Sequence, residues 1–536
     1  MYRFVVIWSA VLALTLGTSG SRASEAPRQP VYGGEIRVAI NSDIRSTNPG
    51  VLRDGNTDMV LYHVVEALVA YRDDLTVGPM LASSIEVSED QKTYIFTLRE
   101  GVTFHNGEKL TAAEVKWSWE RMMRPETGFR CREFYDGRGA TGLLIEEIRV
   151  LDSLRVMFRL NKPSALFLHR MANIQCLTAI LHPDSVGPDG EWKRPIGTGP
   201  YQIGRWQKGR SITLERFDDY VARPEPKNGL TGKKIAYFDR IVFGVTPDRI
   251  AAKSSVYAGN IDLLFAVPLS ANREVERRKK QKGDIKIYHH DTLDWTVLLM
   301  QSEDPLLSNV KLRKAIAHAI SAELVTTFST FNLARKNPSA TATLSPFHTS
   351  FQDRWYDYNP EKAQKLAEEA GYKGEVLRIQ ANRKFSYMFD NAIAIQAMLN
   401  AAGFNAKIEV FDWATQLTNY FSGNFQLSSF GYSARSHPAL MYGNFTGSKK
   451  LRASYQWDNP EAMQMIQDLE TAFTDSETQA ILNDLHQAML DQVPLIGLYN
   501  DHIIDISKDN IHGYEPWAFG RPRLWGVWKS PVQEKE

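Results

Sequence analysis

The amino-acid sequence predicts an α/β protein, and two kinds of segment support this fold class. Segments with apolar residues three or four positions apart follow good N-cap residues, which is typical of amphipathic helices. Between them lie shorter segments in which polar and apolar residues alternate, which is typical of half-buried strands. With 536 residues, 43% of them hydrophobic, the chain is long enough to form more than one hydrophobic core.

The N-terminus has the pattern of a cleaved secretory signal. Arg3 precedes an apolar segment at residues 4–16, and small residues then lead to Ala23. The apolar segment has about 13 residues, fewer than the roughly 20 that span a bilayer, and an A-x-A-like cleavage pattern ends at Ala23. We expect residues 1–23 to be the signal peptide. No cysteine lies near its end to accept a lipid, so we expect a soluble secreted protein and not a lipoprotein.

A strand, a turn and a capped helix are predicted in the first third of the chain. Residues 93–98 alternate as a half-buried strand, and the motif GVTFHNGEKLTAAEV (101–115) contains an Asn-Gly turn that leads into a second extended piece. Thr111, with Glu114 three residues later, forms a capping box in front of an apolar helix face. This order of elements is common, and it requires no chemistry from His105 or Glu114.

Two strands around a basic turn are predicted after residue 200. The motif GTGPYQI (197–203) is followed by Trp206 and by SITLERFDDY (211–220). The two glycines of the first motif permit a positive φ or a close backbone approach, and Pro200 fixes φ where the first strand begins. The pattern predicts a strand entered through a turn and a second strand next to it.

The second half of the chain predicts the helix-to-strand units of an α/β lobe. The helices have Asn or Ser caps, first-position prolines or C-terminal glycines, and their apolar stripes are typical of core-facing surfaces. The predicted segments are helices at 310–320, 359–371, 395–403 and from Asn459 onward, and strands at 406–411 and 493–499.

The motifs at 197–220 and 101–115 resemble two signatures of the family 5 extracellular solute-binding proteins, the dipeptide- and oligopeptide-binding subunits of bacterial ABC importers. The later segments follow the same order, so the resemblance spans nearly the whole mature chain. It implies a two-lobed periplasmic-binding-protein fold of the large type II kind, with an extra peripheral domain and a two-strand hinge between the lobes. Function then comes from closure, because a ligand that contacts both lobes stabilises the closed form.

The resemblance also implies how the chain is divided and what it binds. We expect a ligand between the lobes, permease subunits with their ATPases as partners, a monomeric periplasmic protein, no nucleic acid and no cofactor. The implied parts are the signal peptide at 1–23, the lobe 1 core at 27–62, 195–288 and 504–536, the peripheral domain of lobe 1 at 63–194, and lobe 2 at 289–503.

The segment FGYSARSHPA (430–439) departs from the family pattern at the ligand site. In the peptide-binding members this strand leads to a tryptophan, two residues and an aspartate that pairs with the peptide's α-amino group. Here Tyr432 takes the aromatic position and Arg435 takes that of the aspartate. A guanidinium cannot accept a hydrogen bond from an ammonium, but it binds a carboxylate or phosphate bidentately, so we expect an anionic group on the ligand. The alternative is that Arg435 pairs with a protein carboxylate or points to solvent.

Other residues are weaker candidates for the same site. His437 offers a second donor close to Arg435, although a loop histidine before a proline is more often structural. Aromatic rings cover apolar or sugar-like ligand faces, but most of the 12 tryptophans must belong to the core. Adjacent histidines at 289–290, with Asp291, suggest a metal site only weakly, because neighbours on a strand face opposite ways. The aromatic candidates for the cleft are Trp295, Trp413, Tyr432 and Tyr62, the last near the hinge.

The two cysteines, Cys131 and Cys176, both lie in the mature chain. An oxidising compartment permits a disulfide, and two buried free thiols are the alternative, because the sequence does not give the separation of their Cα atoms. No Cys or His cluster has the spacing of a zinc site, so we expect no bound metal.

Composition and motifs narrow the function classes. The formal net charge is +1, without the basic excess of a nucleic-acid-binding protein, and the basic run at 277–280 is expected on a solvated helix face. After the signal, no apolar segment reaches membrane-spanning length.

Three functions remain. The favoured one is an importer's binding protein for a peptide or peptide-like solute, such as an opine, a sugar-phosphate conjugate or another anionic conjugate. Metal-chelate or haem delivery is the alternative within transport, and it needs histidines that converge on the cleft. A secreted hydrolase is the alternative from another class, but Gly-x-Ser-x-Gly, His-Glu-x-x-His and Walker motifs are missing, so we expect no enzymatic activity.

Overall fold

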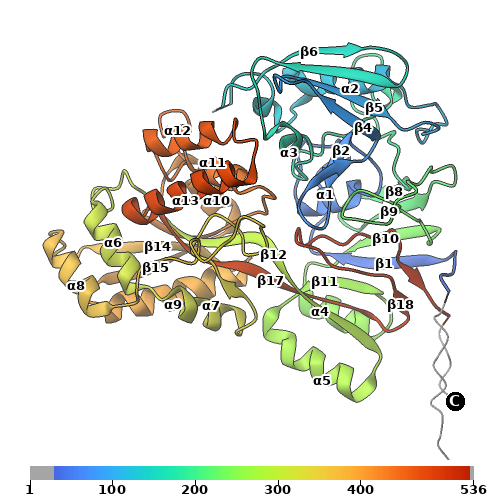
Figure 1. Ribbon diagram of the computed structural model, residues 1–536. Helices are drawn as coiled ribbons and strands as arrows, with labels where there is room; N and C mark the ends of the chain where they lie inside the picture. The colour runs from blue at the N-terminus through green and yellow to red at the C-terminus, as the bar shows by residue number, and fades with distance from the viewer. Residues whose placement is uncertain (1–28, 140, 532–536) are drawn as a thin grey trace, which may run out of the picture.

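One large sheet runs through the protein, whose computed structural model describes residues 29–139 and 141–531 (Figure 1). Within these residues, eleven strands belong to this sheet. The spatial order is β15 (Asn405–Phe411), β14 (Val376–Asn382), β16 (Leu427–Tyr432), β12 (Ile285–Met300), β17 (Leu495–Lys508), β11 (Leu263–Val267), β1 (Glu35–Ile40), β10 (Arg240–Val245), β9 (Ser211–Arg216) and β8 (Tyr201–Gln207); β13 (Arg335–Lys336) pairs with β17. The predicted α/β fold class is confirmed.

The end of the sheet that contains β1 forms the core of the predicted lobe 1. β1 runs parallel to β10 and β11, while β8 and β9 continue the sheet as an antiparallel pair. The helices α4 (Arg249–Tyr257) and α5 (Asn272–Lys282) contact β11 and β12. The two strands predicted around a basic turn are therefore present as β8 and β9. In α5 only Val275 is buried, so the basic run lies on a solvated helix, as predicted.

A separate four-stranded sheet lies in the predicted peripheral domain. Its order is β4 (Ala82–Val87), β5 (Thr93–Leu98), β7 (Arg155–Leu160) and β6 (Ile145–Val150), and α2 (Ala112–Met123) contacts β6 and β7. Both halves of the capping box predicted for α2 are formed, because Thr111 caps the helix and Glu114 bonds back to it. Residues 101–110 make only one isolated pairing, Thr103 with Lys109, so the second extended piece is shorter than predicted. This domain also contains β2 (Val69–Tyr71), β3 (Val77–Pro79) and α3 (Phe167–Met171), and α1 (Gly55–Leu61) precedes it in the chain.

The other end of the sheet forms the predicted lobe 2, with helices on both faces (Figure 1). β14 runs parallel to β15 and β16, as expected for helix-to-strand units. The predicted caps are present, because Asn309, Asn359 and Asn459 each accept a hydrogen bond from the first turn of their helices. The helices are α6 (Val310–Ala319), α7 (Ala322–Thr330), α8 (Pro360–Glu369), α9 (Ser386–Ala401), α10 (Trp413–Ser422), α11 (Pro438–Phe445), α12 (Pro460–Asp468) and α13 (Asp475–Gln492).

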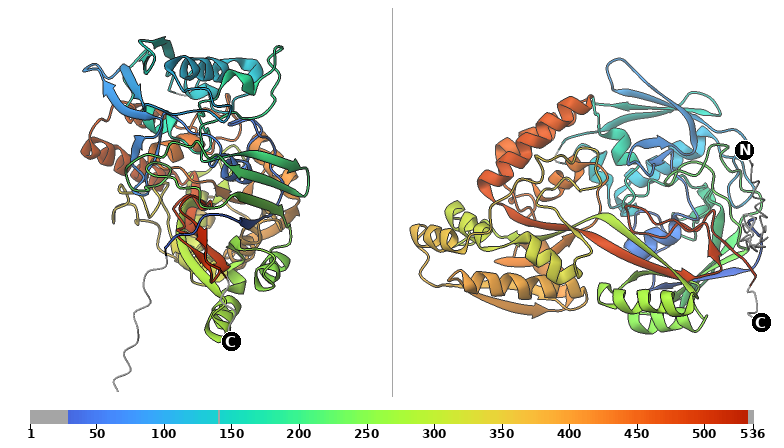
Figure 2. Two further views of the ribbon diagram at one scale, coloured as in Figure 1. Left: turned by 90° about the vertical axis from the view of Figure 1, so that its right-hand side faces the viewer. Right: turned by 60° about the horizontal axis from the view of Figure 1, so that its bottom comes forward.

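Two long antiparallel strands, β12 and β17, join the two ends of the sheet (Figure 2). β12 pairs with β16 of lobe 2 from Trp295 to Met300, whereas β17 pairs with β11 of lobe 1 from Ile504 to Ser507. The register between them shifts between Asp291 and Trp295. The predicted junctions at 288/289 and 503/504 lie inside these strands. β17 extends to Lys508, well past the end of the strand predicted at 493–499. The domain boundaries themselves stay a prediction.

The ends of the chain complete the description. β18 (Ile511–His512) and β19 (Trp528–Lys529) form a small pair near the C-terminus. The predicted signal peptide, residues 1–23, lies outside the described residues. Within the described ranges, no helix is both long and apolar enough to cross a membrane.

Candidate ligand cavity between the two lobes

A cavity of about 390 Å³ lies between the peripheral domain and lobe 2. One wall comes from residues 130–175, which include the loop after α2 and the start of α3. The opposite wall comes from residues 421–470, which include the loop after β16 and the helix α11. A molecule in this cavity therefore contacts segments that are far apart in the sequence and belong to different parts of the fold. Such a position is typical of ligand sites in two-lobed proteins.

Arg435 lines this cavity from the loop between β16 and α11. Its guanidinium donates to the carbonyl oxygens of Ser433 at 2.8 Å and Ala434 at 3.1 Å, and to Asn444 Oδ1 at 3.4 Å. It forms no ion pair with any described residue. The carbonyl contacts hold the side chain in place without neutralising it, so the positive charge remains available to a ligand.

Other arginines surround Arg435. Burial, together with the nearby charges of Arg130 and Arg53, lowers the pKa of Arg435 to about 10. Arg53 is paired with Asp58, whose carboxylate accepts from both Nε and a terminal nitrogen of the guanidinium. Burial raises the pKa of Asp58 to about 6 despite this pair. Arg452 also lines the cavity, and its Nε donates to Ser454 Oγ at 3.1 Å.

Two acidic residues of the hinge strands lie behind Arg435. Asp294 accepts a hydrogen bond from the backbone N–H of Ala434 at 2.5 Å, and Asp501 accepts one from Thr296 Oγ1 at 2.6 Å. Burial raises the pKa of both carboxyls, and the neighbouring Asp294 charge contributes to the rise for Asp501, to about 7. Asp294 thereby anchors the loop that carries Arg435 to the hinge.

A buried ion pair crosses from the peripheral domain to lobe 2 at the edge of the cavity. Arg170 of α3 binds Glu470 with two guanidinium nitrogens, one of them at 2.7 Å, and both side chains are about 95% buried. Ser164 Oγ donates to the same carboxylate at 2.7 Å, and the Ala165 N–H donates to the Glu470 carbonyl at 2.7 Å. These contacts satisfy both charges, so the structure shows the two parts in contact.

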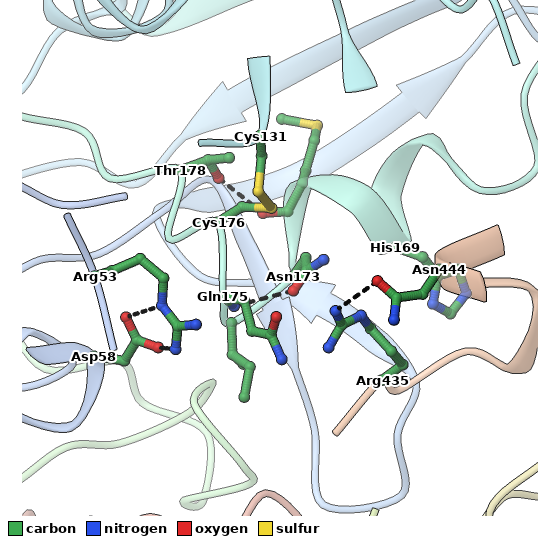
Figure 3. Close-up of a disulfide and its surroundings, with 12 residues drawn as sticks. Arg53, Asp58, Cys131, His169, Asn173, Gln175, Cys176, Thr178, Arg435 and Asn444 are labelled. Atoms are coloured by element: carbon green, nitrogen blue, oxygen red, sulfur yellow. Dashed lines mark hydrogen bonds and ion pairs between the residues drawn. A yellow bond between two sulfur atoms is a disulfide. The ribbon is translucent and has the colours of Figure 1, made fainter. Parts of the chain in front are cut away.

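The cysteines form a disulfide next to the cavity (Figure 3). Their Cα atoms are 5.5 Å apart, and 45 residues separate them in the sequence. Gln175, the neighbour of Cys176, donates from Nε2 to the Ala434 carbonyl of lobe 2 at 3.2 Å. Figure 3 shows Gln175 between the Arg53–Asp58 pair and Arg435. The disulfide thus joins two segments of the same cavity wall.

His437 has a structural position in lobe 2. Its Nδ1 accepts from the Ala439 N–H and so caps α11. The ring packs against His169 of the peripheral domain, with centroids 4.7 Å apart, and against Phe347. Burial and the positive charge of Arg170 lower the pKa of His169 to about 4, and burial lowers that of His437 well below its usual range. His437 lines a second cavity beside the first, not the one that contains Arg435.

The aromatic residues predicted for the cleft do not line this cavity. Trp295 and Tyr432 are 1% and 4% exposed, stack on each other and pack with Phe445 in the core of lobe 2. Tyr62 is 2% exposed and borders a small internal void. Trp413 begins α10 and packs on Phe430. The structure therefore differs from the expectation: Trp295 and Tyr432 point from their strands into the core of lobe 2, while Tyr62 ends α1 and Trp413 begins α10 outside the cavity lining.

The adjacent histidines at the hinge face opposite sides, as the strand geometry requires. His289 contacts His502 and Glu276, whereas His290 contacts the buried Asp505. No group of three or more potential metal ligands occurs among the described residues. His105 bonds to the backbone of Gly199, so its contacts are structural.

Sequence reasoning missed Arg130, Gln175, Arg170 and Glu470. The first two had a usable signal, because each directly precedes a cysteine, and a disulfide places its neighbours together. The Arg170–Glu470 ion pair had no signal in the sequence, because 300 residues separate its two members.

Comparisons with known proteins agree with this architecture. A family model described as "Bacterial extracellular solute-binding proteins, family 5 Middle" matches residues 76–451. The dipeptide-binding protein of Escherichia coli (strain K12) is 25% identical over 510 residues, covering 90% of this chain and 92% of its own. The solved structure of DppA from Helicobacter pylori in complex with the peptide STSA has a TM-score of 0.79 at 23% identity, covering 93% and 98% of the two chains. AgaA from A.tumefacien R10, solved in complex with agropinic acid, has a TM-score of 0.76 at 21% identity, covering 93% and 99%.

Proposed function

The chain belongs to family 5 of the bacterial extracellular solute-binding proteins, and we propose that it captures an anionic, peptide-like solute in the periplasm for an ABC importer. Closure of two lobes around the solute produces the form that the permease subunits recognise. No covalent chemistry is part of this function. The signal-like N-terminus supports export, and the similar proteins named above include binding proteins for a dipeptide, a peptide and agropinic acid.

The observation that carries the anionic part of the proposal is the position of Arg435. Its guanidinium lines the cavity, is held by two carbonyl oxygens and has no carboxylate partner among the described residues. The alternative that it pairs with a protein carboxylate is therefore not what the structure contains. A carboxylate or phosphate of the ligand supplies the missing counter-charge with charge-assisted hydrogen bonds. An ammonium group has no acceptor on this side chain.

The proposed ligand class is a peptide or conjugate with a free acidic group and no requirement for a free α-amine. An opine or a sugar-phosphate conjugate belongs to this class. The apolar side chains of Leu166, Leu440 and Ile466 line the same cavity and suit the less polar part of such a molecule.

The first experiment identifies what the purified mature protein carries. Native mass spectrometry followed by denaturing release is expected to yield an acidic conjugate or an N-blocked peptide. A metal chelate, a haem or ordinary free-amine dipeptides in the cavity would instead contradict the proposed ligand class. Incubation with the released compound is expected to leave it intact, whereas conversion to a product would support a hydrolase.

A direct test uses two matched probes, N-acetyl-dialanine, which has a carboxylate and no amine, and dialanine amide, which has an amine and no carboxylate. We expect calorimetric binding of the first probe only, and complete loss of binding in Arg435→Asp. Arg378 on β14 is the control, because its exposed guanidinium pairs with Glu409 on the neighbouring β15 and neither residue lines the cavity. Arg378→Asp is expected to bind like the wild type. Unchanged affinity in Arg435→Asp would refute the role of Arg435.

A further inference from the structure

We propose that Arg130 and Arg435 bind a doubly charged anionic end of the ligand between them, so that the preferred solute carries two acidic charges at one end. The inference rests on the proposed function and adds to it a second ligand-binding arginine, from the opposite wall of the cavity, and the number of charges on the ligand.

The two arginines approach the cavity from different parts of the fold. Arg130 belongs to the peripheral domain and directly precedes Cys131, while Arg435 belongs to lobe 2. Both side chains line the cavity, and among the neighbouring charges that of Arg130 lowers the pKa of Arg435 the most, ahead of that of Arg53. The Arg130 side chain makes no hydrogen bond or ion pair with any described residue, and solvent reaches it. The two like charges therefore repel each other whenever the cavity is closed and empty.

The charges of the cavity wall do not cancel. Four arginines and two glutamates line it, but Glu470 is already bonded by Arg170. Arg130, Arg435 and Arg452 then face a single carboxylate, that of Glu133. Asp294 also attracts Arg435, but Arg521 acts on Asp294 more strongly than Arg435 does. An excess of two positive charges remains, and two negative charges on a ligand balance it.

A short path of covalent and hydrogen bonds connects the backbone at Arg130 to the backbone beside Arg435. Arg130 is joined through the Cys131–Cys176 disulfide to Gln175, and the Gln175 amide donates to the carbonyl of Ala434, the neighbour of Arg435. Figure 3 shows the disulfide, Gln175 and Arg435 along this path. Because the two backbones are held close and both side chains line one cavity, the two guanidinium groups can reach the same ligand end, which favours a compact dianion over a flexible chain with distant charges.

The geometry also explains how such a ligand promotes closure. Each guanidinium can bind one acidic group bidentately, so two groups on one ligand end occupy both arginines at once. The contact exists only when the peripheral domain and lobe 2 are close, and it replaces a repulsion by two attractions. The ligand therefore has a much higher affinity for the closed form than for the open one.

The test compares N-acetyl-Ala-Glu, with two carboxylates, and N-acetyl-Ala-Gln, which has the same size and one carboxylate. Calorimetry at low ionic strength is expected to show about tenfold tighter binding of the glutamate probe, the effect of one added charge-assisted contact. Arg130→Gln is expected to bring the two affinities within about twofold of each other while retaining the binding of N-acetyl-Ala-Gln.

Arg132→Gln is the matched control. Arg132 lies in the same loop, but it pairs with Asp136 and does not line the cavity, so this variant should keep the preference of the wild type. Equal affinities of the wild type for both probes, or an unchanged preference in Arg130→Gln, would overturn the inference and leave the proposed function standing. Failure of the wild type to bind either probe would refute the proposed function, and the inference with it.

Discussion

The hinge and the cleft contact both join the two lobes, but they consist of different interactions. At the hinge, β12 and β17 pair along most of their lengths through backbone hydrogen bonds. At the cleft, the connection consists mainly of side chains: the Arg170–Glu470 pair, the Gln175 amide and the His169–His437 ring contact. A backbone ladder can bend without breaking, whereas the side-chain contacts must be lost when the lobes separate.

From this difference we predict where the equilibrium between open and closed forms is set. The ladder is common to both forms and contributes little to the difference in their free energies. The cleft contacts join the two lobes, so we expect them only in the closed form; they bury the Arg170–Glu470 pair and His437 and partly bury His169. Substitutions at the cleft are therefore expected to act strongly on closure, and substitutions of exposed hinge side chains only weakly.

The largest effect is expected for Glu470→Ala. Removing this carboxylate leaves Arg170 buried without a counter-charge, which costs about 3–5 kcal/mol in comparable sites. We expect a lower free energy of unfolding in urea and a larger radius of gyration of the ligand-free protein in small-angle scattering, because the closed form is the one penalised.

A surface pair provides the control for Glu470→Ala. Lys311 and Glu369 lie 3.3 Å apart in lobe 2 with both side chains exposed, so Glu369→Ala should change the free energy of unfolding by less than about 1 kcal/mol. If Glu470→Ala is as stable and as compact as the wild type, the cleft contact does not hold the lobes together.

A smaller effect is expected from acidification. His169 and His437 have pKa values lowered by burial, and Arg170 lies beside both. Once exposed, these rings take up protons below their usual pKa of about 6.5, so the stability that they contribute is present above pH 6.5 and is lost as the pH falls toward 4. Between pH 7 and pH 5 we expect each of the two rings to contribute a loss of roughly 1–2 kcal/mol to the free energy of unfolding, measured in urea.

Replacing both rings tests this assignment. His169→Gln combined with His437→Asn, which keeps a side-chain acceptor for the cap of α11, should reduce the measured loss by the part that these two rings contribute. His486 is the control, since it is buried within lobe 2 and bonds to the Arg354 carbonyl, and its pKa is lowered to about 4. His486→Gln should flatten the pH dependence of unfolding but leave that of the radius of gyration unchanged. An unaltered pH profile in the double variant would contradict the prediction.

The smallest effect is expected at the hinge surface. His289 is exposed on β12 and contacts His502 and Glu276. Because the strands remain paired through their backbones, His289→Ala should change the free energy of unfolding by less than about 0.5 kcal/mol. The radius of gyration should stay the same within experimental error. A large change in either quantity would show that hinge side chains also set the closure equilibrium.

Much of the secondary structure could be predicted because its signals are local. The capping box at Thr111, the alternation at 93–98 and the Asn caps of α6, α8 and α12 each act within one turn or one strand. The second extended piece predicted in the 101–115 motif is reduced to one isolated pairing, Thr103 with Lys109. An extended segment becomes a strand only when a partner strand is available.

The candidate site was predictable only in part. Arg435 could be proposed from the sequence, since the reversal of charge in the 430–439 segment is visible there. The aromatic candidates could not be separated from core residues, because Trp295 and Tyr432 have the same local pattern whether they face a cavity or the interior. His437 combines a local role, the cap of α11, with a long-range contact to His169 that its sequence neighbours do not indicate.

The sequence by itself determined the α/β class and most of the helix and strand positions, and its resemblance to the family made Arg435 a candidate for the ligand site. Each of these depends on residues close together in the chain. Only the tertiary structure decided that Arg130 and Arg435 line one cavity, that Glu470 meets Arg170, and that the rings of His169 and His437 pack on each other. These contacts join segments hundreds of residues apart, and their strength depends on burial and on the distance between charges, which the folding of both lobes around one hinge establishes.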